Sequence, residues 1–136
     1  MEKRDYLLRQ IEALGRILSR LRELIVGGAT ATARSEIQEE LRNAGLELSM
    51  ANALDAKTLL MLLGSPVLDV RRAFMVASLL HVDALRARAE GDVTWAGRSA
   101  ANAFALFSAM RPMLDAERGA LADQIMDEIR GTAASG

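Results

Sequence analysis

The segment 69–112 constrains the fold more strongly than any other part of this sequence. Between residues 69 and 90 it contains neither proline nor glycine, and apolar residues recur at steps of three and four, which predicts one long buried helix. Gly91 and Asp92 interrupt the pattern, because glycine adopts positive φ without strain and aspartate caps a following helix. A second helix is predicted over 93–111, and a proline ends it. The segment therefore predicts two antiparallel helices joined by a tight turn.

The second helix of this pair carries an alanine-rich seam that matches a known kind of repeat. The seam consists of Ala96, Ala100, Ala103, Phe107 and Met110. With the Gly91–Asp92 turn, Phe104 and the closing Pro112, it resembles one repeat of the tetratricopeptide type. The order of segments, from a Lys-Arg-Asp-Tyr helix through Gly-Leu-Glu-Leu to the hairpin, also resembles a family of small bacterial tetratricopeptide-like proteins of unknown function. The resemblance implies an all-α, right-handed array of antiparallel helical hairpins and transfers no catalytic residue.

An amphipathic helix is predicted for Glu2–Val26, and its apolar pattern is the most regular in the chain. The seam is spaced by four and three residues, as in the a and d positions of a heptad repeat, and consists of Leu7, Ile11, Leu14, Leu18, Leu21 and Ile25. Further leucines and an isoleucine widen the stripe beyond the needs of a two-stranded coiled coil. The stripe is therefore expected to pack on the chain's own core, on a second copy of the chain, or on both. Gly27 and Gly28 follow as a flexible break that permits either arrangement.

The middle of the chain contains shorter elements. Thr30 or Thr32 is expected to cap a helix that ends at Gly45. Ser49 is then expected to cap a single turn, and Asp55 a short leucine-rich helix. The leucine and methionine content of this part exceeds what one side of a short helix buries. It therefore either packs beneath the hairpin or faces a partner.

Asp115 is expected to cap a last helix over 116–129. Taken together, the elements predict a single all-α domain over 1–136. It comprises an N-terminal amphipathic helix at 1–26, a tetratricopeptide-like core at 29–130 and a disordered tail at 131–136. The composition agrees, because 51% of the residues are hydrophobic and only two are proline.

The charge and composition argue against several classes of function. The formal net charge of −1 leaves no field that would attract nucleic acid or an anionic membrane surface. The absence of cysteine excludes disulfides and thiolate chemistry. No apolar run approaches the roughly 20 residues of a membrane span, and the N-terminus does not resemble a secretory signal, so a cytoplasmic location is expected.

The sequence offers few residues for chemistry. His81, the only histidine, shares a helical face with Ser78, but Asp83 points to another side and no oxyanion donor accompanies the pair, so a structural histidine is expected. Glu36 and Glu40 lie one helical turn apart without a histidine at a ligand spacing. No catalytic residue, metal site or cofactor is therefore predicted.

Four residues are candidates for contact with a partner or ligand: Arg71, His81, Arg88 and Trp95. The two arginines flank the first helix of the hairpin, and the tetratricopeptide resemblance implies that this helix could hold a peptide carboxylate. Trp95 is interpreted either as a packing anchor or as a residue that faces a partner.

These features predict a non-enzymatic helical protein–protein interaction module that forms a homodimer through the helix carrying Leu7 to Ile25. The physical reason is a surplus of apolar surface over what a chain of 136 residues covers with 4% aromatic side chains. The alternative is a small ligand-binding or regulatory protein. Its apolar pocket would lie between the hairpin and the Leu59–Leu63 helix, gated by His81 or Arg88.

Overall fold

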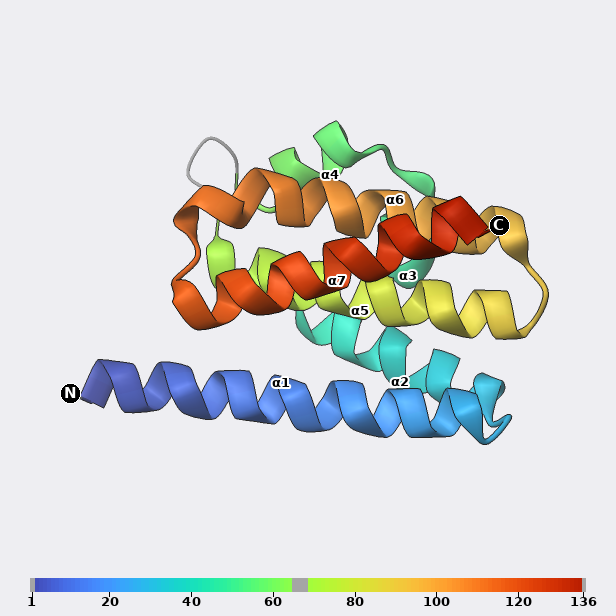
Figure 1. The fold of residues 1–136 in the computed structure, drawn as a ribbon, viewed down its shortest axis with the longest axis horizontal. Coiled ribbons are helices and arrows are strands. Elements are labelled where there is room, and N and C mark those ends of the chain that lie inside the picture. The colour runs from blue at the N-terminus through green and yellow to red at the C-terminus, as the bar shows by residue number, and fades with distance from the viewer. Residues whose placement is uncertain (1, 65–68, 136) are drawn as a thin grey trace.

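A computed structural model of the chain describes residues 2–64 and 69–135, with side chains described for 12–64 and 69–132. All regular secondary structure in these ranges is helical, which confirms the prediction of an all-α chain (Figure 1). The elements are α1 Glu2–Val26, α2 Thr30–Asn43, α3 Leu48–Ala53, α4 Ala56–Leu62, α5 Val70–Ala89, α6 Val93–Met110, the 3₁₀ turn η1 Arg111–Met113, and α7 Ala116–Ser135. None of the helices in the described part of the chain combines the length and apolarity needed to cross a membrane.

The antiparallel pair α5 and α6 forms the centre of the molecule (Figure 1). α5 is apolar on nearly all sides, and α6, α2 and α1 pack around it. α3, α4 and α7 pack on the remaining faces of α6. Phe74 of α5 meets Phe107 of α6 edge to face, with ring centroids 5.6 Å apart. The predicted helical hairpin is therefore the core around which the other helices are placed.

α1 and α2 form a second antiparallel pair, which packs on α5. Gly28 has a φ of +86° and makes the tight turn between them. Ile37 and Leu41 of α2 are fully buried in this pair. The first turns of α1 extend beyond the ends of the other helices (Figure 1).

Four of the predicted helix caps are confirmed. The carboxylates of Asp55, Asp69, Asp92 and Asp115 each accept a hydrogen bond from the backbone amide three residues later, over 2.8, 3.2, 3.1 and 2.8 Å. Each bond satisfies an amide that the first helical turn leaves without a partner. The Asp–amide bond therefore marks where α4, α5, α6 and α7 begin.

Two predicted caps are wrong. The N-cap of α2 is Ala29 and that of α3 is Glu47, and neither makes a side-chain capping bond, so Thr30, Thr32 and Ser49 do not cap. The reason lies in the preceding turn. The Ala29 amide donates to the carbonyl of Leu24 over 2.8 Å, which closes α1 and brings the chain directly into α2.

The predicted end of the last helix is also wrong. α7 continues through residues 131–135 to Ser135, where a disordered tail was expected. The Thr132 hydroxyl donates to the carbonyl of Glu128 over 2.9 Å, and the Arg130 guanidinium lies 5.1 Å from the Phe104 ring centroid. The hydrogen bond lies within α7 and the cation–π contact reaches α6, so both favour helix here in spite of the low helix propensity of Gly131.

Candidate functional site

The first of two polar clusters lies between α5, α6 and α3, and we call it the Asp83 cluster. It comprises Asp83, Arg86, Trp95, Ser99 and Asn52. The Asp83 carboxylate is 0% exposed. Its Oδ1 accepts from Nε and Nη2 of Arg86 over 2.9 and 2.8 Å. Its Oδ2 accepts from the Trp95 indole over 2.7 Å and from the Ser99 hydroxyl over 2.8 Å. Both oxygens are thus occupied away from water, so the carboxylate is structural and out of a substrate's reach.

Asparagine side chains extend this cluster to α3. The Asn52 amide donates to the Ser99 hydroxyl over 2.8 Å and to the Trp95 carbonyl over 3.0 Å. Asn102 of α6 donates to the carbonyls of Ala51 and Leu54, each over 2.9 Å. The backbone of a short helix is therefore held by side chains of the neighbouring long helix, because six residues alone form too little helical structure to be stable.

The outer side of the Asp83 cluster is closed by a cation–π contact. The Arg34 guanidinium of α2 lies 5.7 Å from the centroid of the Trp95 ring. Trp95 is half-buried, and its indole nitrogen is bound to Asp83. From its place in α6, Trp95 contacts residues of α2, α3 and α5. These contacts within the chain are those of a packing anchor.

The second polar cluster joins α5 to α7 and α1, and we call it the His81 cluster. His81 Nε2 lies 3.0 Å from Glu128 Oε2 and 3.2 Å from Arg22 Nη2, and Arg22 Nη2 lies 3.2 Å from the same Glu128 oxygen. The His81 side chain is 4% exposed, whereas those of Arg22 and Glu128 are 43% and 38% exposed. The cluster therefore has a buried imidazole and two charged partners at the surface.

The surroundings shift both titrating groups of the His81 cluster. Burial lowers the pKa of His81 below its ordinary 6.5, and this outweighs the opposing effect of Glu128; the charge of Arg22 lowers it further. Burial alone would raise the pKa of Glu128, but the bonds and charges of Arg22 and His81 lower it by more. At neutral pH the imidazole is therefore neutral beside an ionised Arg22–Glu128 pair.

The structure does not bring the four predicted contact residues together. Arg71 and Arg88 are exposed near opposite ends of α5. His81 and Trp95 belong to the two different clusters. A single site built from these four residues does not exist in this fold.

The apolar seam of α1 is divided between described and undescribed side chains. Leu14 and Leu21 are 7% and 1% exposed and belong to the chain's own core. Leu18 and Ile25 are half-buried against that core, and the side chains of Leu7 and Ile11 lie outside the described residues. An interface that used all six residues would require α1 to leave its place on α5.

Ser78 lies one helical turn before His81 on α5. The Ser78 hydroxyl is buried and has no hydrogen-bond partner, so it is not bonded to His81 as an activated nucleophile would be. The described residues include no group of three or more Asp, Glu or His side chains arranged to hold a metal ion. Glu36 instead accepts a hydrogen bond from Arg20 over 3.0 Å.

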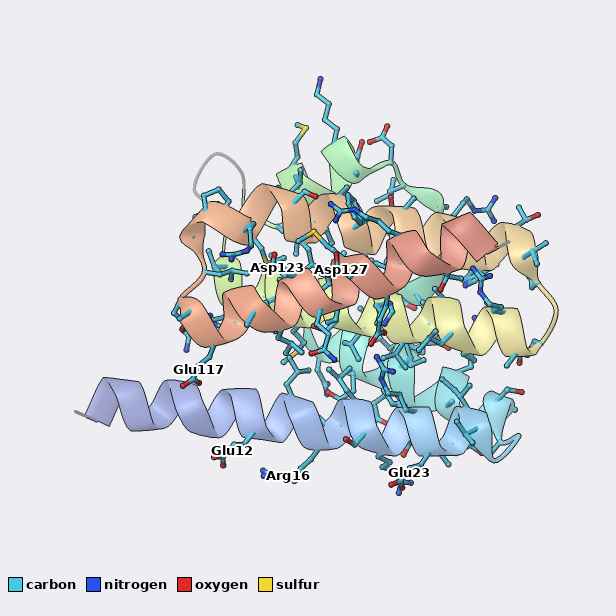
Figure 2. All side chains as sticks on the ribbon, in the orientation of Figure 1. Glu12, Arg16, Glu23, Glu117, Asp123 and Asp127 are labelled. Carbon is cyan, nitrogen blue, oxygen red and sulfur yellow. The ribbon has the colours of Figure 1, made fainter. Side chains whose placement is uncertain are left out.

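A shallow, open hollow on the surface of α1 is lined by Glu12, Gly15, Arg16, Ser19, Arg20 and Glu23. All of these belong to α1, so no second element closes the hollow, and Figure 2 shows Glu12, Arg16 and Glu23 pointing away from the other helices. At the position proposed for an apolar pocket, Leu59 and Leu63 are fully buried. His81 contacts α1 and α7, not the helix that carries these leucines.

The residues of both clusters were largely missed by sequence reasoning. Asp83 and Arg86 are the exception that could have been found, because an acid and a base one turn apart in an otherwise apolar helix must pair when buried. Asn52 and Glu128 carry no such local signal.

No protein-family model, no curated protein and no solved structure matches the chain.

Proposed function

We propose that the protein is a non-enzymatic helical interaction module that binds a second copy of itself through the first turns of α1. The observation that supports this is the length of α1 relative to what covers it. At 1.5 Å per residue, the 25 residues of α1 extend about 38 Å, whereas the two helices that pack on it, α2 and α5, extend about 21 and 30 Å. The first turns also project past the other helices (Figure 1).

The first turns of α1 continue the apolar seam that the core already uses. Leu7 and Ile11 precede Leu14 by seven and three residues, so an unbroken helix gives them the same register as the buried part of the seam. Burying a leucine or isoleucine side chain stabilises a contact by about 1.5–3 kcal/mol. Two copies related by a two-fold axis would bury these residues reciprocally, which supports a homodimer.

We propose further that α5, α6 and α7 follow the tetratricopeptide-like, right-handed arrangement, with α7 in the place of the next repeat's first helix. The order of contacts is consistent with it, because α6 packs on both α5 and α7. The exposed acids Asp123 and Asp127 give α7 the polar outer side that the last helix of such an array requires.

The homodimer is tested by measuring the absolute mass in solution by light scattering across a range of concentrations. We expect twice the chain mass of 14.7 kDa, and a return to 14.7 kDa when Leu7→Glu and Ile11→Glu are combined. Val26→Glu is the control: it places one glutamate at the far end of α1, where Val26 is 89% exposed, and should leave the dimer mass unchanged. A mass of 14.7 kDa at every concentration, or a dimer that survives the double substitution, would overturn the proposal.

A further inference from the structure

The two hydrogen-bond partners of His81 Nε2 require opposite protonation states of that nitrogen. An ionised carboxylate only accepts hydrogen bonds and a guanidinium only donates them. Nε2 therefore satisfies Glu128, 3.0 Å away, when it carries a hydrogen, and Arg22, 3.2 Å away, when it does not. The presence or absence of a proton on Nε2 therefore determines whether the imidazole bonds to Glu128 of α7 or to Arg22 of α1.

Among the described side chains, Glu128 and Arg22 are the charges that act on the protonation of His81, and the neighbouring charged residues are paired elsewhere or point away. On its own helix, Asp83 and Arg86 are paired with each other on the side that faces α6. Near Arg22 on α1, Arg20 is paired with Glu36 of α2, and Glu23 points away from the core (Figure 2). On α7, Asp127 is paired with Arg130. The imidazole nitrogen Nε2 thus contacts one base from α1, Arg22, and one acid from α7, Glu128.

We propose that the His81 cluster is a pH-sensitive latch that holds α1 and α7 on α5 at neutral pH and loosens α1 in mild acid. In the closed state, neutral His81 accepts from Arg22, and Arg22 pairs with Glu128. When His81 takes up a proton, an imidazolium lies in van der Waals range of a guanidinium with a single carboxylate to neutralise both. Arg22 is the partly exposed member of the two cations, so it is the one that moves into water, and α1 loses its polar attachment to α5 and α7.

The latch goes beyond the proposed homodimer and does not depend on it, because all of its members belong to one chain. The lowered pKa of His81 is consistent with the direction of the switch: the folded state disfavours the proton, so uptake is coupled to opening. The Asp83 cluster, on the other side of α5, contains no histidine and is expected to remain closed.

The first test follows the imidazole itself by proton NMR across pH. Because the chain has one histidine, its ring signals need no further assignment. We expect Arg22→Met to raise the pKa of His81 and Glu128→Gln to lower it, since the two neighbours act in opposite directions. Arg20→Met, which removes an exposed cation of α1 paired elsewhere, is the control and should not move it. Shifts of the same sign in the two variants, or no shift in either, would overturn the latch.

The second test measures whether α1 loosens. Amide hydrogen exchange at about pH 7.5 and about pH 5.5, corrected for the intrinsic pH dependence of exchange, should show a several-fold loss of protection in residues 12–26 at the lower pH. His81→Gln keeps an amide near the position of Nε2 but does not titrate, and should remove this loss. Equal protection at both pH values in the natural sequence, or the same loss in His81→Gln, would contradict the proposal. Should His81→Gln not fold, comparison with Arg22→Met serves the same purpose: its α1 should show no further loss in acid.

Discussion

The two sides of α5 treat buried polar groups in opposite ways. On the side of α6 and α3, the Asp83 carboxylate is sealed from water and every oxygen is bonded, so its contacts allow one arrangement. On the side of α1 and α7, buried His81 is bonded to two partly exposed partners whose demands conflict. The comparison indicates that a buried polar group has one fixed arrangement when all of its hydrogen bonds are made inside the protein. A ring nitrogen that two partners share, and that water can reach through them, can change its hydrogen bonds.

The largest effect is expected at Asp83. Asp83→Ala leaves the Trp95 indole and the Ser99 hydroxyl without their acceptor and leaves the buried Arg86 guanidinium with Glu90 alone, so we expect a loss of about 3–5 kcal/mol in the free energy of unfolding. Urea denaturation followed by the fluorescence of the single tryptophan measures it. Asp127→Ala removes a 74% exposed carboxylate and should change stability by no more than about 0.5 kcal/mol. A loss at Asp83 as small as that of the control would mean that the hydrogen bonds of its carboxylate do not stabilise this side of α5.

The next effect is expected at Asn102, where the Asp83 side extends to α3. Asn102→Ala leaves the carbonyls of Ala51 and Leu54 without their donor, and we expect a loss of about 1–3 kcal/mol. Hydrogen exchange should show the loosening in α3 before the other helices. Asn43→Ala, at the exposed end of α2, is the matched control. Loss of protection spread evenly over the molecule would show that α3 is held by apolar contacts instead.

On the other side of α5, stability should depend on pH. The pKa of His81 is lowered in the folded state from the ordinary 6.5, so the unfolded chain binds the proton more tightly. The stabilisation is therefore complete above about pH 6.5 and is lost as the pH falls through the folded-state pKa. Urea midpoints between about pH 7.5 and about pH 5.5 should fall for the natural sequence and fall less for His81→Gln. If the urea midpoints of the two proteins fall in parallel with pH, the decline comes from carboxylates and not from His81. The two sides of α5 would then not differ in pH dependence.

The smallest effect is expected at the rim of the Asp83 cluster. Arg34→Met removes the cation over the Trp95 ring while it retains an unbranched apolar side chain, and we expect a loss of about 0.5–1 kcal/mol. A change in tryptophan fluorescence should accompany it, and Arg16→Met, on the outward face of α1, should cause neither change. A loss that approaches the loss at Asp83 would mean that the sealed cluster depends on its exposed rim.

Much of the fold could be predicted because it depends on neighbours within one helical turn. Asp69 and Asp92 mark the starts of α5 and α6, since a carboxylate there needs only the amide three residues later. Gly45 and Gly91 mark helix ends, since the backbone there has positive φ. Thr30 and Ser49 failed as caps because both lie inside their helices: α2 begins at Thr30 itself and α3 begins at Leu48.

Periodicity established that α1 and α5 each have an apolar face, but only the tertiary structure decided what covers it. Leu14 and Leu21 are buried in the chain's own core. The heptad spacing alone did not distinguish this placement from packing on a second copy. The clusters were beyond sequence reasoning for the same reason. His81 meets Arg22 and Glu128, which are 59 and 47 residues away in the chain, and Asn52 meets Ser99 across 47. Spacing along a helix determines which side chains share a face, whereas the packing of whole helices determines which faces meet.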